Sequence, residues 1–402
     1  MVSKSPKMPK FGNLQGLKVV FSGVEIAGPW GPQMMAEWGA DVTWIEQVKY
    51  EDSLRVQSHY CELDRRNQHS LSLNIFSEEG REIFLKLMGK TDIFIESSKG
   101  PAFAKRGITD ELLWKHNNSL VIVHVSGFGQ YGKEQMVNRA SYDLISQAYS
   151  GYLIQNGDVN RPIPAFPYTG DYMTAFMVLG ASLAALYHAQ KTGIGESIDI
   201  AMHEVMLRVG QYYMMNYFNG GKNFPQRGKD PYAGCGVYKC KDDFIVTNVE
   251  GTRQVKGMLE LIGMSHILGT EGYPEGIPLL AVDSPLGPSV EEKIEAFYAN
   301  KTVAEVEKEL DKYKIAAAKV MTFEDIVKDP HYAAREDLIE WETLNGRKCK
   351  GPNVFPKFKK NPGQVWRPTP SRGMDTEDIL SDLGYSSERI QELCDKEVIK
   401  KS

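Results

Sequence analysis

Short apolar stretches alternate with amphipathic ones along the first half of the chain, and this alternation limits the possible folds more than any other feature. Strand-like stretches occupy residues 17–22, 42–46, 92–96, 120–126 and 197–200. Apolar residues at helical spacing predict helices at 28–38, 79–88, 110–115, 142–149 and 203–215. Strands that alternate with helices form parallel sheets covered by helices on both faces. The sequence therefore predicts an α/β fold with a large domain built on a parallel sheet.

The alternation of strand-like and helical stretches ends near residue 219. Glycine-rich runs at 219–221 and 228–236 indicate a linker, and short strands and charged helices follow at 237–239, 244–249, 253–262, 290–298 and 303–310. We expect the first part of the large domain at 1–220 and a smaller α+β domain at 225–325. Residues 326–402 would form a linker and a return to the large domain, with a strand at 338–342 and helices at 376–383 and 387–394.

Composition excludes several classes of protein. A net charge of -5 gives no electrostatic footprint for nucleic acid, although a local basic cluster can still hold an anionic ligand. The five cysteines are scattered and odd in number, which favours a reducing compartment over a disulfide framework. The eight histidines have no spacing typical of a metal site. The basic N-terminus has no apolar core, so we expect no signal peptide and a cytoplasmic protein.

One carboxylate, Asp171, stands directly before nineteen residues, 172–190, that contain no Asp, Glu, Lys or Arg. The apolar spacing of this run predicts a helix buried on most sides. Asp171 would then lie at the N-cap or in the first turn, where the helix dipole favours its ionised form. It could be a cap or a nucleophile, and spacing alone favours the cap. The run is nearly long enough to span a membrane, but its polar residues indicate a core helix.

Three turns that follow predicted strands are candidate ligand-binding segments. Residues 23–30 lack both the dinucleotide fingerprint and the lysine of a P-loop, so neither nucleotide site is supported. The turn after residue 96 carries Lys99, Lys105 and Arg106, which could hold phosphates or could simply be a solvated basic turn. The glycine-rich segment 126–132 could bring backbone N–H groups close to a ligand, or be a plain turn.

Several segments together resemble the class III CoA-transferases (CaiB/BaiF type). They are residues 17–22, 27–29, 37–42, 126–129 and 195–200. Within that family, residues 8–12, 166–172, 204–208, 217–221 and 350–357 are most similar to the L-carnitine CoA-transferase branch. The resemblance covers nearly the whole chain.

The resemblance implies a Rossmann-like large domain, a small domain, and two subunits interlocked as a homodimer. The family's nucleophilic aspartate falls on Asp171, and the CoA-binding lysine and arginine fall on Lys99 and Arg106. The implied reaction moves CoA from crotonobetainyl-CoA or γ-butyrobetainyl-CoA to L-carnitine through an aspartyl-CoA thioester. CoA and acyl-CoA would be substrates, with no cofactor, no metal, no nucleic acid and no membrane involved.

The chain departs from the family pattern at a few places. Residues 97–101 differ from the Asn-Phe-Arg-Pro-Gly of many members, and the nearest candidate for a mobile glycine loop is only Gly234-Cys235-Gly236. A related branch racemises α-methylacyl-CoA with a histidine beside an aspartate, and Tyr142 stands at that position here. Racemisation is therefore disfavoured, while CoA transfer to another carboxylic acid stays an alternative. Trp30, Tyr168 and Tyr172, with Glu25, could surround a trimethylammonium group or could be core packing.

Overall fold

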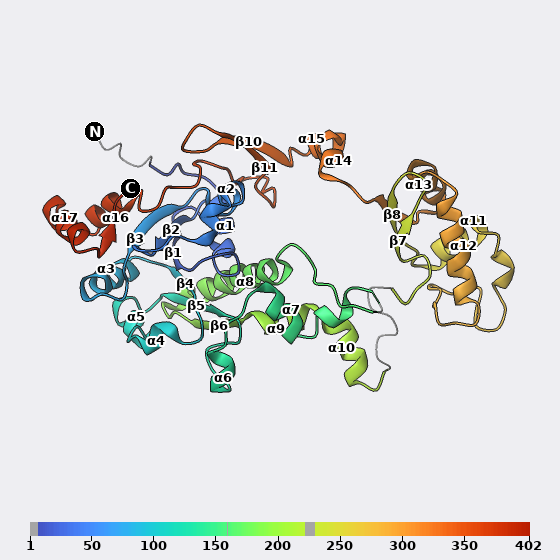
Figure 1. The fold of residues 1–402 in the computed structure, drawn as a ribbon, viewed down its shortest axis with the longest axis horizontal. Coiled ribbons are helices and arrows are strands. Elements are labelled where there is room, and N and C mark those ends of the chain that lie inside the picture. Colours follow the sequence, from blue (N-terminus) through green and yellow to red (C-terminus); the bar gives the residue numbers. More distant parts are fainter. Residues whose placement is uncertain (1–6, 159, 222–229) are drawn as a thin grey trace. The chain divides into compact units, whose positions relative to one another are not determined.

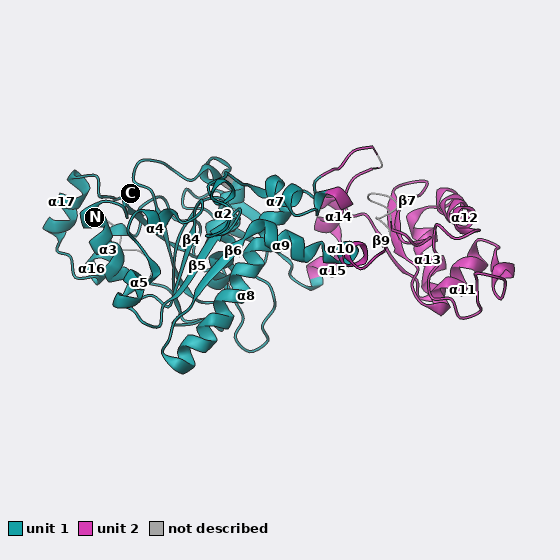
Figure 2. Ribbon diagram, turned by 90° about the horizontal axis from the view of Figure 1, so that it is seen from below, with its two compact units in different colours: residues 1–153, 164–214, 334–402 teal, residues 154–163, 215–333 magenta. Residues whose placement is uncertain are grey.

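The structure, a computed structural model, describes residues 7–158, 160–221 and 230–402. It divides into two compact units, which Figure 2 draws in teal and magenta. Unit 1 comprises Met1–Leu153, Pro164–Met214 and Ala334–Ser402, and unit 2 comprises Ile154–Ile163 and Met215–Ala333. The chain therefore leaves unit 1 and later returns to it. Residues 222–229, where part of the glycine-rich linker and a domain boundary were expected, and residues 1–6 lie outside the described residues.

A seven-stranded sheet with the strand order β12-β3-β2-β1-β4-β5-β6 is the centre of unit 1 (Figure 1). All neighbouring strands are parallel except β12, which runs antiparallel to β3. The strands are β1 Lys18–Ser22, β2 Asp41–Glu46, β3 His69–Leu73, β4 Ile93–Ser97, β5 Val121–Ser126, β6 Ser197–Ala201 and β12 Ile399–Lys400. Apart from β12, this is the strand order of doubly wound nucleotide-binding folds, so the predicted α/β class and parallel sheet are confirmed.

Helices cover both faces of this sheet. On one face α1 (Trp30–Glu37) and α8 (Thr169–Thr192) share a buried apolar cluster with the strands. On the other face the cluster is shared with α3 (Glu78–Met88), α5 (Asp110–His116), α16 (Thr376–Asp382) and α17 (Ser387–Asp395). The shorter elements of unit 1 are α2 Ser58–Arg65, α4 Ala102–Lys105, α6 Glu134–Val137, α7 Asp143–Tyr149, α9 Met202–Val209 and the hairpin β10 Leu338–Glu342 with β11 Lys348–Pro352.

Helix α8 begins at Thr169, so Asp171 lies in its first turn, one of the two positions expected for it. Tyr168 at the N-cap has a left-handed backbone with φ +46°. Only nine of its 24 residues are buried, and Phe176, Met177 and Tyr187 on another face are exposed, so burial on most sides was wrong. Its length and composition would permit a membrane span, but Val178 and Leu179 pack in the core of unit 1 as in a core helix of a globular domain.

Two further differences have local causes. Strand β3 escaped prediction because it follows Asp64-Arg65-Arg66 and has polar Ser70 and Ser72, which are nonetheless fully buried. The helix predicted at 203–215 is two helices, α9 and α10 (Gln211–Phe218), which meet at Gly210.

Unit 2 is a small α+β unit with its own core. Strands β7 (Gly236–Lys239), β8 (Phe244–Asn248) and β9 (Ala316–Lys319) form an antiparallel sheet. Helices α11 (Thr252–Leu261), α12 (Gly287–Ala299) and α13 (Val303–Tyr313) pack on it through a buried cluster that includes Ile245, Met258, Ile294 and Leu310. The remaining helices of this part are α14 Phe323–Lys328 and α15 Pro330–Ala334. The predicted class of the smaller domain is thereby confirmed.

Candidate active site

The carboxyl ends of β1, β2 and β4 surround a cavity of about 210 Å³. In the strand order of unit 1, the direction in which strands are added reverses between β1 and β4, and open α/β sheets bind ligands at such a point. The residues lining the cavity include Ser22, Gly23, Val24, Glu46, Asp52, Phe76, Ser97, Ser98 and Arg106. A larger cavity of about 900 Å³ lies at the opposite edge of the sheet, against Lys18, Asp41 and His69, where the strands begin. The smaller cavity is therefore the better candidate.

The turn after β1 passes very close to the end of β4. A Cβ atom on Gly28 would lie 2.6 Å from the Cβ atom of Ser97, and one on Gly23 would lie 2.8 Å from it. Any side chain at either position would push the turn away from β4. The two glycines with P-loop spacing thus allow close packing of the turn, without the lysine that phosphate binding in a P-loop requires.

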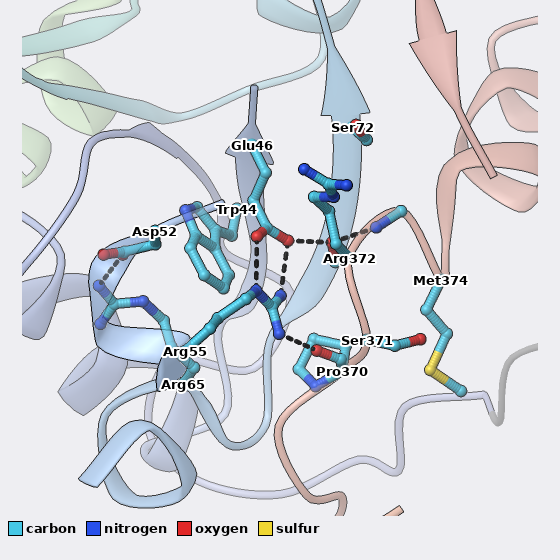
Figure 3. Close-up of polar contacts among 12 residues, drawn as sticks. Trp44, Glu46, Asp52, Arg55, Arg65, Ser72, Pro370, Ser371, Arg372 and Met374 are labelled. Atoms are coloured by element: carbon cyan, nitrogen blue, oxygen red, sulfur yellow. Dashed lines mark hydrogen bonds and ion pairs between the residues drawn. The ribbon is translucent and has the colours of Figure 1, made fainter. Parts of the chain in front are cut away.

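Polar contacts behind this cavity fix the end of β2 (Figure 3). The Arg55 guanidinium donates from Nε to Glu46 Oε1 at 2.8 Å and from Nη2 to Glu46 Oε2 at 2.7 Å. Arg55 and Arg65 also lie over the Trp44 ring, with Cζ atoms 4.6 and 4.8 Å from its centroid. Arg65 donates to Asp52 Oδ2 at 3.1 Å. These buried carboxylates are consequently paired with arginines.

Asp171 does not cap its helix. The cap is Asp143, the first residue of α7, whose Oδ1 accepts from the Gly170 N–H at 2.6 Å and from the Asp171 N–H at 3.3 Å. Gln147 Nε2 donates to the other Asp143 oxygen at 2.8 Å and holds it in place. The Asp171 carboxylate accepts no hydrogen bond from the part of the chain that the structure describes. Its side chain is therefore available for chemistry.

The surroundings of Asp171 are acidic and largely dehydrated. Asp171 is 8% exposed. Burial, followed by the nearby charges of Asp143 and Glu25, raises the pKa of Asp171 to about 7. The expectation that the helix dipole keeps this carboxylate ionised was incomplete, because dehydration and two like charges outweigh it. With a pKa near 7 this carboxyl group is partly protonated at neutral pH, and its carboxylate is more basic than an exposed one.

Aromatic rings gather at the start of α8. The Trp30 ring meets Tyr172 edge-on at 4.8 Å and Phe176 edge-on at 5.1 Å between centroids. Tyr60 lies 6.2 Å from the Tyr168 ring, and its hydroxyl is hydrogen-bonded to that of Tyr172. The structure thus brings the three aromatic residues named from the sequence into one cluster. Tyr60 joins them from α2, which no sequence pattern had indicated.

The basic residues named from the sequence lie on one segment after β4. Arg106 lines the 210 Å³ cavity with its guanidinium 4.2 Å from the Phe76 ring centroid. Lys99 is exposed on the loop before α4 and is not among the residues that line the cavity. Lys105 Nζ donates to Asn138 Oδ1 at 2.7 Å and so faces elsewhere.

Two backbone amides of the glycine-rich segment 126–132 already have acceptors. The Gly129 N–H donates to Ser126 Oγ at 2.9 Å, and the Gln130 N–H donates to Asp199 Oδ2 at 2.8 Å. These two amides are therefore not free for a ligand, and neither is the Gly170 N–H, which donates to Asp143. Tyr142, at the position of the racemase histidine, is 69% exposed. Among the residues described, no group of three or more His, Cys, Asp or Glu side chains could hold a metal ion.

A family model, CoA-transferase family III, matches residues 14–376 of the chain. The chain belongs to CoA-transferase family III. As a member of this family it is a CoA-transferase, with CoA and acyl acids as its substrates.

Solved structures agree with this family III fold. A CAIB/BAIF family protein from Brucella suis is 24% identical, with a TM-score of 0.74 over 93% of this chain and 100% of its own. The protein Rv3272 from M. tuberculosis is 18% identical, with a TM-score of 0.77 over 92% of this chain and 100% of its own. At these identities the likeness concerns the fold.

The Asp143 cap gives a first prediction. Asp143→Ala removes the acceptor for two helix N–H groups, so we expect a loss of about 1–2 kcal/mol in the free energy of unfolding. Asp143→Asn keeps an oxygen for those amides and should lose less, while removing a charge that raises the pKa of Asp171. Urea denaturation of the three proteins measures the stabilities. Equal losses in the two variants would contradict the assignment of the cap.

The pKa of Asp171 gives a second prediction, for stability. The folded carboxyl has a pKa near 7 and the unfolded one a pKa near 3.8, so the folded protein holds the proton more tightly. Its stabilising contribution is present below about pH 4 and is lost as pH rises through 7. Asp171→Asn should therefore be more stable than wild type at pH 8, by about 1–3 kcal/mol, and not at pH 4. Thermal melts across this range check it, and a pH-independent difference would refute the raised pKa.

Proposed function

We propose that this CoA-transferase moves CoA between trimethylammonium carboxylic acids, from crotonobetainyl-CoA or γ-butyrobetainyl-CoA to L-carnitine. Asp171 would carry CoA as an aspartyl thioester between the two half-reactions. The observation that carries the proposal is the environment of Asp171. This carboxylate lies among aromatic rings and two further acids, Asp143 and Glu25.

A quaternary ammonium group suits this environment. It cannot donate a strong hydrogen bond, so it is best held by aromatic faces and by negative charge nearby. Trp30 and Tyr172 supply faces and edges beside Asp171, and Tyr168 is partly exposed next to Tyr60. Glu25 and Asp143 add negative charge that raises the pKa of Asp171. A cationic acid would relieve this repulsion, whereas an uncharged acid would not.

The carboxylate explains how CoA can move between acids without loss of the thioester's free energy. An Asp171 oxygen attacks the acyl-CoA carbonyl carbon, the C–S bond breaks, and a mixed anhydride and CoA thiolate result. The thiolate then attacks the Asp171 carbonyl carbon, which releases the first acid as its carboxylate and leaves an aspartyl-CoA thioester. The carboxylate of the incoming acid attacks this thioester and displaces the thiolate, which finally takes the new acyl group. Asp171 is regenerated, and no proton is gained or lost.

CoA itself would lie along the carboxyl ends of the strands. The 210 Å³ cavity with Arg106 at its edge is a suitable place for phosphate groups, and Lys99 on the adjoining loop adds a second positive charge. The turn 23–30 links this cavity to Asp171, because Gly23 lines the cavity and Glu25 acts on the Asp171 carboxylate. The phosphates and the thioester would therefore both lie beside this turn.

We also propose that the enzyme is an interlocked homodimer in the cytoplasm. The exposed apolar side chains of α8, Phe176, Met177 and Tyr187, are suited to burial by a second subunit. The five cysteines are all free thiols, which agrees with a reducing compartment.

Asp171 is tested directly by substitution and trapping. Asp171→Ala should reduce CoA transfer from crotonobetainyl-CoA to L-carnitine by at least about 10³-fold, because it removes the nucleophile. CoA binding should stay within about threefold, because the cavity is untouched. Wild-type enzyme incubated with acyl-CoA and then hydroxylamine should show a mass change in the Asp171 peptide. An active Asp171→Ala enzyme, or a modified peptide elsewhere, would refute the role of Asp171.

The aromatic cluster is tested with a matched pair of substrates. Trp30→Ala or Tyr168→Ala should raise the KM for L-carnitine by about 3- to 30-fold through loss of cation–π attraction. The KM for the carbon analogue of carnitine, in which tert-butyl replaces trimethylammonium, should change much less. Tyr385→Ala, which alters an aromatic residue beside Lys86 at the C-terminal helices, is the control. Equal effects on both substrates would show that the rings only pack.

A further inference from the structure

A half-buried imidazole, that of His124, joins two carboxylates at the edge of the candidate site. His124 on β5 lies beside Glu96 on β4 in the register of the sheet. Its Nδ1 is 2.8 Å from Glu96 Oε1, and its Nε2 is 3.0 Å from Asp110 Oδ1, the first residue of α5. Glu96 is completely buried. The two carboxylates thus contact opposite nitrogens of one ring.

This arrangement requires a charged ring. A neutral imidazole has one N–H, so one of the two carboxylates would face a nitrogen lone pair. Burial alone would lower the pKa of His124, but the hydrogen bonds to Asp110 and Glu96 outweigh it and raise the pKa to about 10. The other acid in register with His124, Asp199 on β6, instead accepts from the Gln130 N–H at 2.8 Å. His124 is therefore an imidazolium at neutral pH.

The second oxygen of each carboxylate holds another hydroxyl. The Ser98 Oγ–H donates to Glu96 Oε2, and the Ser197 Oγ–H donates to Asp110 Oδ2 at 2.6 Å. Ser98 also lines the 210 Å³ cavity. The imidazolium is thus connected on one side to the cavity wall and on the other side to β6.

Ser98 and Asp110 lie at the two ends of one segment of the chain. The segment between them, residues 99–109, carries Lys99 and Arg106, both basic residues expected to bind the CoA phosphates. The segment contains two glycines with positive φ, Gly100 and Gly107, and only the single turn of α4. Phe103 and Ile108 anchor the middle of this segment in the core, and one charged ring holds both of its ends.

We propose that His124 is a positioning residue for CoA, which clamps both ends of the segment 99–109 through Glu96–Ser98 and Asp110 and so orients Lys99 and Arg106. The inference rests on the proposed binding of CoA phosphates by that segment. The hydrogen bond from Ser98 to Glu96 extends this cluster to the wall of the cavity, which stabilisation of the fold alone does not require. The clamp predicts that the ring's charge affects CoA affinity beyond its effect on folding.

The test compares CoA affinity in four proteins by isothermal titration calorimetry. In His124→Gln, a neutral side chain leaves Glu96 buried without its cation, and CoA should bind about tenfold more weakly. In His124→Gln/Glu96→Gln the uncompensated charge is gone and an amide pair replaces the ion pair, so most of the affinity should return. Leu393→Ala, in the core at α17 and matched for lost stability, should bind CoA as wild type does. The kcat and the KM for L-carnitine should stay unchanged in His124→Gln at saturating acyl-CoA.

Two further measurements keep the proposal open to refutation. Nitrogen NMR of the His124 ring in the wild-type protein should show both nitrogens protonated from pH 6 to 9, and titration near pH 6.5 would overturn the charged clamp. Should His124→Gln not fold, Ser98→Ala removes only the link to the cavity wall and should weaken CoA binding about threefold. Unchanged CoA affinity in the folded variants would overturn the clamp alone. A wild-type protein that does not bind CoA would overturn the proposed function as well.

Discussion

The N-terminus of α8 is the constraint on which the site depends, because it fixes where the Asp171 carboxylate lies. A helix N-terminus leaves N–H groups that need acceptors, and a residue such as Asp171 would ordinarily supply one. Here Asp143 supplies it from α7, with a bond of 2.6 Å to the Gly170 N–H. The close approach leaves no room at residue 170, where a Cβ atom would lie 2.6 Å from Ser146 Oγ. A glycine before the acid, and a second acid to cap the helix, together release Asp171 from a structural role.

Several buried acids of unit 1 form ion pairs with arginines, whereas Asp171 forms none with the residues that the structure describes. Glu46 is paired with Arg55, Asp52 with Arg65, and Glu37 with Arg66, and all three acids are buried. The charges that act on Asp171, by contrast, are those of the acids Asp143 and Glu25, and together with burial they raise its pKa to about 7. A buried charge without a partner costs stability unless something compensates for it. Asp64 is a second buried acid whose carboxylate oxygens accept no hydrogen bond in the described part of the chain, and burial raises its pKa to about 7 as well. At the candidate site, a buried acid without a cation beside it is what a cationic substrate or a reactive carboxylate would require.

The sequence predicted the parts of the fold that depend on continuous apolar strands. Strands β1, β2, β4 and β5 are buried along most of their length and have a simple signal, and the edge strand β6 keeps an apolar alternation although Asp199 is exposed. Strand β3 does not, because buried serines alternate with its leucines and bond to the C-terminal segment, as Ser70 does with Asp375 about 300 residues away. Asp171 was noticed because an uncharged run follows it. Its cap was not, since Asp143 lies 28 residues earlier and only the fold brings the two together.

The turn between β1 and α1 connects the cavity with the surroundings of Asp171, and no sequence motif predicted this connection. It fits no nucleotide fingerprint, yet it contacts the cavity at Gly23, acts on Asp171 through Glu25, and reaches the aromatic cluster at Trp30. Glu25 has a left-handed backbone with φ +61°, which is strained for a residue with a side chain. Arg65 holds that conformation by donating to the Glu25 carbonyl at 2.6 Å. This buried arginine also contacts Trp44 and Asp52, so one side chain helps to fix both the wall of the cavity and the charge beside Asp171.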